Sequence, residues 1–370
     1  MSDTFGQARQ HFLDGLAQFE AGRIEQAEAH FEAALALVPG RVSTLVNLGA
    51  TRIRLGRPDA ALPLLAQALA AEPDDADAWM HRGIALAELG RHGEALLAFE
   101  RQSALRPDDA QAWTNRASVL KALSRRDEAA AAYRQAMAHG GDAALNSYYL
   151  AALTGADPPR TPPRRYVERL FDDYAETFDA HLVGALGYRA HRLMLEPLQG
   201  QARRFRHALD LGCGTGLCGA LIRAVAARAD GVDLSAAMLA KARALGVYGQ
   251  LEQADLVAHL GHTDQRHDLV VAADVFIYVG ALEAVFSGVQ RVLEPGGTFC
   301  FSAEQATGDA DFELRPSLRY AHSERYLRAV AAQSGFDVER MVSQPIREDQ
   351  RRPIPGLYAY LRAGADPFNP

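Results

Sequence analysis

A glycine-rich loop in the second half of the chain is the clearest candidate for chemistry. The segment HALDLGCGTG, at 207–216, is a short apolar run that turns into glycines, and the residues after it, LCGALIRAVAAR, have helical composition and spacing. We therefore expect a strand, a loop and a helix. The absence of a β-carbon at Gly212, Gly214 and Gly216 lets the backbone pass close to a ligand. The helix N-terminus behind them favours an anionic group.

Further acidic residues stand at the ends of expected strands. The segment ADGVDLS places Asp233 about 20 residues after Gly214, which is the spacing at which a carboxylate meets ribose hydroxyls. The segment YGQLEQAD ends in Asp255, which can accept from an adenine amine while Leu256 packs on the ring. With Asp210, directly before the loop, we expect three acidic strand ends to line one rim.

The loop by itself leaves two cofactors open. The stretch from Gly214 to Gly219 also fits the dinucleotide fingerprint G-x-G-x-x-G, and Asp233 would suit the ribose of NAD. The set DLGCGTG, GVDLS, AD and LEPGG resembles the signature of class I S-adenosylmethionine-dependent methyltransferases. The resemblance covers roughly residues 166–365. It implies an α/β Rossmann-like domain with a seven-stranded sheet, whose last two strands form an antiparallel edge hairpin, and S-adenosyl-L-methionine as cofactor.

The resemblance also implies which residues form the site. The expected cofactor-binding residues are Tyr174, Asp210, Gly212, Gly214, Gly216, Asp233, Leu234, Met238, Asp255, Leu256 and Asp274. Tyr174 belongs to an amphipathic helix whose aromatic and apolar stripe is formed by Val167, Leu170, Phe171, Tyr174 and Phe178. Two interpretations of this stripe stay open: ordinary packing against the following domain, and a lid over the cofactor.

Catalytic residues are harder to assign, because methyl transfer from a sulfonium mainly needs alignment and exclusion of water. The reaction requires no metal, and Cys213, Cys218 and Cys300 have no zinc-site spacing. His322 is the expected general base, since its unperturbed pKa lies near 6.5. It also precedes Ser323, an expected helix N-cap, and can simply belong to that turn. Tyr278 is the second catalytic candidate.

Two features near these candidates indicate which class of methyl acceptor to expect. The fourth expected strand ends in DVFIY instead of the Asn/Asp-Pro-Pro-aromatic motif, which disfavours planar amide or base nitrogens as acceptors. Five arginines either hold an anionic substrate or are solvated loop charges: Arg315, Arg319, Arg347, Arg351 and Arg352.

The first third of the chain repeats itself every 34 residues, as Gly22, Gly56, Gly90 and Ser124 show. Alanine, aromatic or leucine, and proline columns keep the same register. The columns resemble tetratricopeptide repeats and predict a solenoid of helical hairpins over residues 8–141. The resemblance implies a concave surface for a protein or peptide partner. Packing on the second domain, or dimerisation, is the alternative.

The proline-rich segment DPPRTPPRR marks the domain boundary. We expect a repeat domain at 1–156, with about four repeats and a capping helix, and a methyltransferase domain at 157–370. More narrowly, YVERLFDDYAETFDAHLV and RYAHSERYL are similar to a group of predicted bacterial methyltransferases that carry tetratricopeptide repeats. The substrates of that group are unassigned.

The composition of the chain limits the kinds of partner that we expect it to bind. The net charge of -7 argues against nucleic acid, and no segment has the ~18 apolar residues that a membrane span needs, so a cytoplasmic protein is expected. Three functions stay open: a methyltransferase guided to a protein client by the repeats, the same enzyme acting on a small molecule, and a scaffold that binds the cofactor without turnover. An NAD-binding oxidoreductase is the remaining alternative.

Overall fold

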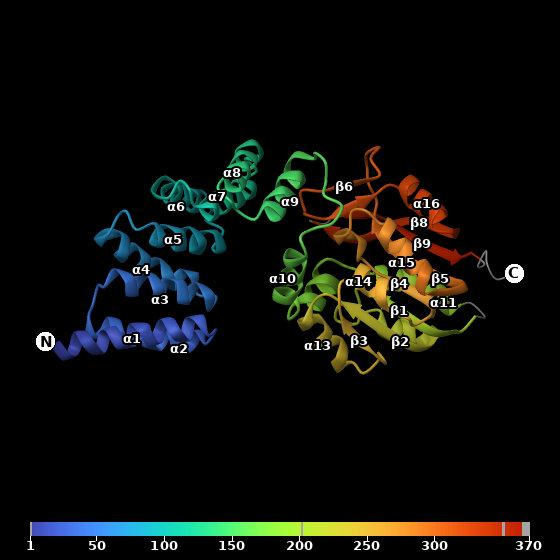
Figure 1. Ribbon diagram of the computed structural model, residues 1–370, viewed down its shortest axis with the longest axis horizontal. Helices are drawn as coiled ribbons and strands as arrows, with labels where there is room; N and C mark the ends of the chain where they lie inside the picture. The colour runs from blue at the N-terminus through green and yellow to red at the C-terminus, as the bar shows by residue number, and fades with distance from the viewer. Residues whose placement is uncertain (1, 201–202, 350–351, 365–370) are drawn as a thin grey trace. The chain divides into compact units, whose positions relative to one another are not determined.

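The chain folds into two compact units, Met1–Thr154 and Gly155–Pro370, each with its own hydrophobic cores. We call them the repeat unit and the sheet unit. The structure, a computed structural model, describes residues 2–200, 203–349 and 352–364 (Figure 1). None of its helices is long and apolar enough to cross a bilayer.

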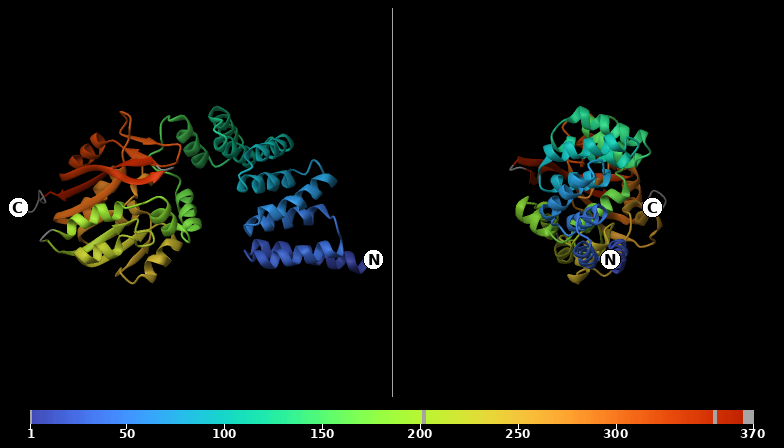
Figure 2. Two further views of the ribbon diagram at one scale, coloured as in Figure 1. Left: turned by 180° about the vertical axis from the view of Figure 1, so that it is seen from behind. Right: turned by 90° about the vertical axis from the view of Figure 1, so that its left-hand side faces the viewer.

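The repeat unit consists of successive antiparallel helices that lie side by side in chain order (Figures 1 and 2). Neighbouring helices share buried faces, so the cores run from one hairpin into the next. This confirms the expected all-α solenoid. The helices are α1 (Ser2–Glu20), α2 (Ile24–Leu37), α3 (Val42–Arg54), α4 (Pro58–Ala71), α5 (Ala76–Glu88), α6 (His92–Leu105), α7 (Ala110–Ala122), α8 (Arg126–Ala138) and α9 (Ala143–Thr154).

The repeated glycines end the first helix of each hairpin. Gly22, Gly56 and Gly90 have φ of 74°, 69° and 73°, in the left-handed region that closes helix C-termini. Ser124 takes the same conformation, with φ of 60°, in the fourth hairpin. The 34-residue period therefore reflects one turn geometry repeated along the solenoid.

The sheet unit is built on a seven-stranded sheet in the order β3-β2-β1-β4-β5-β9-β8. Strands β1 to β5 run parallel, whereas β9 is antiparallel to both β5 and β8, which confirms the expected edge hairpin. The strands are β1 (Phe205–Leu211), β2 (Ala226–Asp233), β3 (Leu251–Gln253), β4 (His267–Ala272), β5 (Leu293–Glu304), β8 (Phe336–Asp349) and β9 (Arg352–Ala363). A separate small hairpin pairs β6 (Phe312–Leu314) with β7 (Tyr320–His322).

Helices cover both faces of this sheet. One core packs Leu260, Phe286 and Leu327 against the strands, and the opposite core packs Met194 and Ile222. Strand β4 is buried along its whole length, as expected for a central parallel strand. The helices are α10 (Arg164–Tyr174), α11 (Ala190–Gln199), α12 (Gly219–Val225), α13 (Ala236–Ala244), α14 (Leu256–His262), α15 (Glu283–Val292) and α16 (Glu324–Gln333), with a π-helix at Ala180–Ala185 and a 3-10 helix at Phe276–Tyr278.

The strand order fixes where a ligand can bind. The chain moves outward from β1 to β3 and then returns to place β4 on the other side of β1. In open parallel sheets, ligands bind outside the carboxyl ends of the strands at such a switch point. The glycine loop lies at this point, because it follows β1 directly.

Candidate active site

A cavity of about 580 Å³ opens at the carboxyl ends of β1, β2 and β4. Its size is typical of a small-molecule site. Most of the expected site residues line it: Tyr174, Gly212, Gly214, Asp233, Leu234, Met238, Asp255, Leu256, Asp274 and Tyr278. Among the described residues, the lining does not include three others that were expected, Asp210, Gly216 and His322.

The glycine loop leaves space that a ligand can occupy. Gly212 and Gly214 have positive φ, at 66° and 55°. A β-carbon on Gly212 would lie 2.6 Å from Cγ2 of Val275, so only glycine fits there. By contrast, no described atom lies within 4 Å of a β-carbon built on Gly214, which lines the cavity. The bare backbone at Gly214 therefore faces open space, as the close approach of a cofactor requires.

Asp233 holds the glycine loop against the end of β2. Its Oδ2 accepts a hydrogen bond from the Gly214 amide at 2.8 Å, and its Oδ1 accepts one from the Ser235 amide at 2.9 Å. Burial raises the pKa of this carboxyl, while the backbone donors oppose that shift. Because the carboxylate also lines the cavity, ribose hydroxyls can supply further donors to its remaining lone pairs.

Asp255 plays the corresponding part at the end of β3. Its Oδ1 caps α14 by accepting from the amides of Val257 and Ala258, both at 3.0 Å. Its Oδ2 has no partner among the described residues, which leaves it available to an adenine amine. Leu256 lies beside it in the cavity wall as an apolar surface for a ring.

Asp210 lies beneath the loop instead of on the cavity rim. It is 1% exposed and accepts a hydrogen bond from the Tyr248 hydroxyl at 2.6 Å. Burial raises its pKa to about 7. Gly216 also faces inward, since a β-carbon there would lie 2.8 Å from Cδ1 of Leu245. Of the three acidic strand ends expected on the rim, only Asp233 and Asp255 therefore line the cavity.

His322 lies apart from the cavity lining and is fully buried. Its ring nitrogen Nε2 lies 2.9 Å from the carbonyl oxygens of both Val279 and Gly280, so it donates between them. Burial lowers the pKa of the ring to about 4. These contacts tie β7 to the segment after the 3-10 helix, and this placement does not support the expected role as general base.

Tyr278 does line the cavity, beside Phe171 of α10. Burial raises the pKa of its phenol, and the nearby Arg319 guanidinium opposes the shift. The phenol is thus protonated at neutral pH and can donate a hydrogen bond. A phenol that keeps its proton can orient a ligand, but it does not abstract a proton from one.

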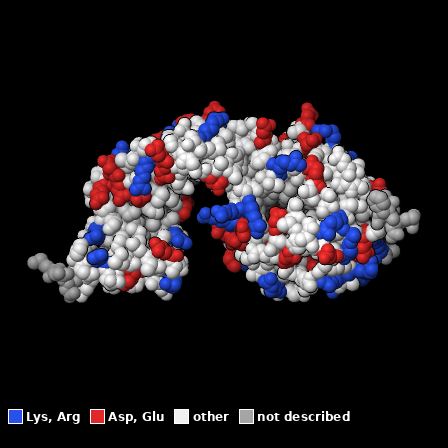
Figure 3. Space-filling view, viewed as in Figure 1, with Lys and Arg blue, Asp and Glu red and all other residues white. Residues whose placement is uncertain are grey.

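Helix α10 forms one wall of the cavity. The stripe residues Val167, Phe171, Tyr174 and Phe178 line it, and the Phe171 ring meets Tyr278 edge-on at 5.1 Å. The helix ends at Tyr174, earlier than the apolar spacing suggested, and Phe178 follows a turn at 175–177, in the helical residues directly before the π-helix. Basic and acidic side chains gather over the outer surface of α10 (Figure 3).

Three acidic residues tie the α10 segment to the expected cofactor loops. Asp172 accepts a hydrogen bond from the Ser235 hydroxyl at 2.5 Å. Asp179 accepts from the Thr215 hydroxyl at 2.6 Å, and Glu176 pairs with Lys241 at 3.1 Å. None of these residues was singled out from the sequence, because acidic residues on an amphipathic helix are usually solvated.

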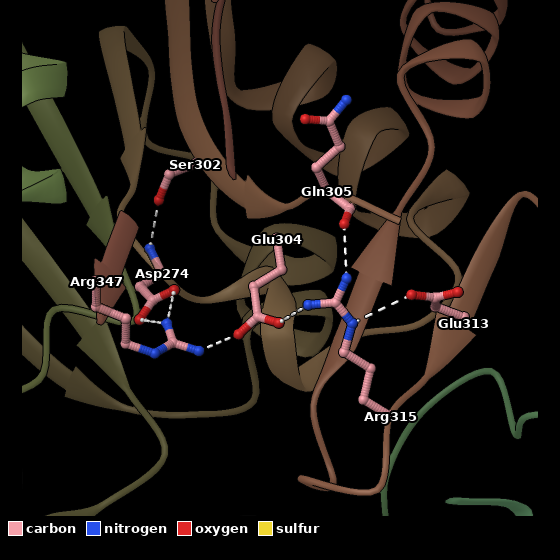
Figure 4. Close-up of polar contacts among 7 residues, drawn as sticks. All are labelled: Asp274, Ser302, Glu304, Gln305, Glu313, Arg315 and Arg347. Carbon is pink, nitrogen blue, oxygen red and sulfur yellow. Dashed lines mark hydrogen bonds and ion pairs between the residues drawn. The ribbon is translucent and has the colours of Figure 1, made fainter. Parts of the chain in front are cut away.

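A buried ionic network underlies the cavity at Asp274 (Figure 4). The Asp274 carboxylate accepts from Nη1 of Arg347 at 3.0 and 2.8 Å, and its amide donates to the Ser302 hydroxyl at 2.9 Å. Arg347, which is 3% exposed, also pairs with Glu304. Asp274 therefore lines the cavity with its charge already balanced. The sequence left Arg347 as either a substrate ligand or a solvated loop charge, and its buried ion pairs were not foreseen because the partners lie far away along the chain.

Comparison with known proteins bears on the same segments. A family model described as "Methyltransferase domain" matches residues 208–297, which contain the glycine loop, Asp233, Asp255 and Asp274. Models described as "Tetratricopeptide repeat" match residues 46–110 and 110–138. The first match decides against the dinucleotide interpretation of the loop.

Among curated proteins, the chain is similar to the trans-aconitate 2-methyltransferase of Paracidovorax citrulli. The two are 33% identical over 130 residues, 35% of this chain and 45% of that protein. The malonyl-[acyl-carrier protein] O-methyltransferase of Enterobacter lignolyticus is 33% identical over 139 residues, 36% of this chain and 54% of that protein. The chain thus spans about half the length of these relatives.

Solved methyltransferases resemble the structure more distantly. The N-methyltransferase NodS of Bradyrhizobium japonicum is 15% identical, with a TM-score of 0.43 over 53% of this chain and 97% of that one. Magnesium protoporphyrin IX methyltransferase of Synechocystis is 16% identical, with a TM-score of 0.43 over 57% and 100%. By these family models, the chain matches tetratricopeptide repeats over residues 46–138 and a methyltransferase domain over residues 208–297.

Proposed function

We propose that the chain transfers a methyl group from S-adenosylmethionine to an acceptor bound in the cavity beneath α10. The observation that carries this proposal is the convergence of Gly214, Asp233 and Asp255 on one cavity. In our assignment the bare loop takes the methionine part of the cofactor, Asp233 the ribose and Asp255 the adenine. Leu234 and Met238, which also line the cavity, would pack against the nucleoside.

Bound S-adenosylmethionine would supply an electrophilic methyl group, and the chain's own residues would align the acceptor and exclude water. The α10 stripe closes one side of the cavity with apolar surface, and Tyr174 and Tyr278 add hydroxyls at its wall. Because Arg347 balances the Asp274 carboxylate, that residue would shape the floor without acting as a base.

The relatives name different acceptors, trans-aconitate in one case and a malonyl group on acyl-carrier protein in another. We further propose that the concave face of the repeat unit binds a protein or peptide partner. Such a partner would be a client of the enzyme or a protein that carries the acceptor.

Transfer of labelled methyl to a fractionated lysate tests both proposals. Purified chain and methyl-labelled S-adenosylmethionine are added to the protein and small-molecule fractions, and the assay is repeated with a chain that lacks residues 1–155. We expect label in one fraction with the full chain. Loss of protein labelling in the shortened chain, with cofactor affinity intact, would support recruitment by the repeats, whereas unchanged labelling would contradict it.

A further inference from the structure

The small β6–β7 hairpin brings one guanidinium to the cavity. Arg319 precedes β7 and lines the cavity, where it is partly buried. Its guanidinium lies near the phenols of Tyr278 and Tyr174, where its positive charge opposes the rise that burial causes in the pKa of each. Its charge is therefore at the same wall as the two tyrosines and the α10 stripe.

The hairpin holds this arginine in a defined position. The Leu318 amide donates to the Arg315 carbonyl at 2.8 Å, and the Arg315 amide donates to the Arg319 carbonyl at 2.9 Å. Leu318 takes a positive φ of 63°, which closes the turn. The side chain of Arg315 then anchors the hairpin to Glu304 of β5 at 2.8 Å, and it pairs with Glu313 within the hairpin at 3.1 Å (Figure 4). A residue presented in this way loses little further freedom on binding a ligand.

Arg319 differs from the other arginines of this region, which are paired with carboxylates or exposed; Arg164, which also lines the cavity, is exposed, whereas Arg319 is partly buried. Arg315 and Arg347 are neutralised by Glu304, Glu313 and Asp274 (Figure 4). At the cavity mouth, Arg160 pairs with Glu283 at 2.7 Å. Arg352 is exposed on β9, and Arg351 lies outside the described residues.

Arg319 forms no ion pair with a carboxylate in the part of the chain that the structure describes. A partly buried charge without an opposite charge is unfavourable unless a ligand supplies one. A guanidinium fork matches a carboxylate in geometry as well as in charge. The unpaired Arg319 therefore favours a substrate that carries an acidic group.

The other residues that line the cavity indicate the chemistry of the rest of such a substrate. Around Arg319 and the tyrosines the wall is apolar, with Val167, Phe171, Ile277, Val279 and Ala284. Apolar surface of this kind favours a hydrophobic body attached to the acidic group.

The lining also offers no ready proton acceptor among the described residues. Asp233 and Asp255 face the expected cofactor, Asp274 is paired with Arg347, and burial raises the pKa of both phenols, Tyr174 and Tyr278. A carboxylic acid has an ordinary pKa near 4 to 5 and is ionised at neutral pH, so it needs no base to become a nucleophile.

We propose that the methyl acceptor is an apolar carboxylic acid, oriented by Arg319 and methylated on a carboxylate oxygen. This inference rests on the proposed methyl transfer. One carboxylate oxygen pairs with Arg319 while the other attacks the methyl carbon. The O–CH₃ bond forms as the S–CH₃ bond breaks, the bonding electron pair stays on sulfur, and the acid becomes a neutral methyl ester. No proton is transferred.

The test uses the chemistry of the product. Full-length protein is incubated with methyl-labelled S-adenosylmethionine and a lysate of the source organism, and the labelled product is then treated with alkali. A methyl ester releases labelled methanol, whereas methyl groups on nitrogen, sulfur, carbon or an ether oxygen remain bound. We expect most of the transferred label to be released. Alkali-stable label would overturn this inference while leaving the proposed methyl transfer intact.

Variants of Arg319 provide the second part of the test. Arg319→Leu should lower the rate of ester formation about tenfold or more, because charged hydrogen bonds are lost, and Arg319→Lys should recover part of it. Arg325→Leu, which removes an exposed guanidinium paired with Asp311, is the matched control and should keep the wild-type rate.

All three variants should bind S-adenosylhomocysteine as wild type does, which separates loss of the acid from loss of the cofactor. An unchanged rate in Arg319→Leu would overturn the role of Arg319. If the wild-type protein transferred no label at all, both the proposed function and this inference would fail.

Discussion

At the scale of single residues, the site uses acidic side chains that also stabilise the backbone around them. Asp233 fastens the glycine loop and Asp255 caps α14, and both still face the cavity. Their carboxylates are thus oriented before any ligand arrives. A preorganised acceptor of this kind binds more strongly than a mobile one, because less entropy is lost on binding.

His322 allows a residue-scale prediction about pH. Its folded-state pKa, about 4, lies below its unfolded value near 6.5, so the unfolded chain binds one more proton between these values. The ring's contribution to stability is therefore present above pH 6.5 and is lost as the pH falls toward 4, by at most about 1.4 kcal/mol per pH unit.

His322→Gln should remove this dependence, so the stability gap between wild type and variant should narrow as the pH falls from 6.5 to 4. Hydrogen exchange of the β4 and β5 amides would measure it in the core of the sheet unit. A gap that stays constant with pH would contradict the buried, neutral state of the ring. Affinity for S-adenosylhomocysteine should be unchanged at pH 7.

Residues at strand ends could be predicted from the sequence, but their orientation could not. Local spacing correctly brought Asp233, Asp255 and the glycine loop to one edge. Asp210 points inward, where its carboxylate accepts a hydrogen bond from the hydroxyl of Tyr248, a residue on another loop. The pairing of Asp274 with Arg347 joins the end of β4 to β8, and no local motif carries information about such a pair.

At the scale of elements, the position of α10 fits both interpretations that its stripe left open. It packs against the sheet unit, and the surface that it covers is the cavity itself. The hydrogen bonds and ion pair from Asp172, Glu176 and Asp179 attach it to the segments that would contact the cofactor. Cofactor binding and the position of α10 should therefore be coupled.

Asp172→Ala tests this coupling. Loss of the bond from Ser235 should weaken S-adenosylhomocysteine binding several-fold and expose α10 to faster tryptic cleavage after Arg165. Asp173→Ala is the matched control, because Asp173 is a 73% exposed neighbour on the same helix. Calorimetry and limited proteolysis would measure the two effects. If the two variants behaved alike, the hydrogen bond between Ser235 and Asp172 would not be what holds α10 in place.

In the repeat unit, the approach of paired helices depends on glycine. A β-carbon on Gly83 of α5 would lie 2.5 Å from Cε1 of Phe99 on α6. Gly83→Ala should therefore destabilise the repeat unit by about 1–3 kcal/mol through overpacking. In the next helix, Gly93 has no described atom within 4 Å of the same position, so Gly93→Ala should be neutral or stabilise by ~0.5–1 kcal/mol.

Tryptophan fluorescence during urea unfolding would measure both changes. Both tryptophans of the chain, Trp79 and Trp113, lie in the repeat unit, so this signal reports that unit alone. If the two alanine variants unfolded at the same urea concentration, the close packing at Gly83 would be contradicted.

At the scale of the whole molecule, a periodic array and an open parallel sheet are joined in one chain. Both could be predicted from the sequence because each rests on repetition: the 34-residue period in one case, and alternating strands and helices in the other. The β6–β7 hairpin could not be predicted in the same way, since short irregular segments have no period, and the sequence did not separate Arg319 from the four other arginines considered for an anionic substrate. The part of the site that would choose the acceptor lies in this least predictable segment.

The division into units has a consequence for the cofactor. Every described residue of the cavity lining lies between Arg160 and Arg319, within the sheet unit. The determinants of cofactor affinity are therefore expected in the sheet unit, whereas those of a partner would lie in the repeat unit.

The central claim is that S-adenosylmethionine binds at the carboxyl ends of these strands, and calorimetric titration of the full chain tests it most directly. Wild type and Asp264→Ala, which changes an exposed loop aspartate, should bind alike. Asp233→Ala should bind at least about tenfold more weakly, because the ribose loses a charged acceptor and the glycine loop loses its tie. No binding by wild type, or equal binding by Asp233→Ala, would contradict the account.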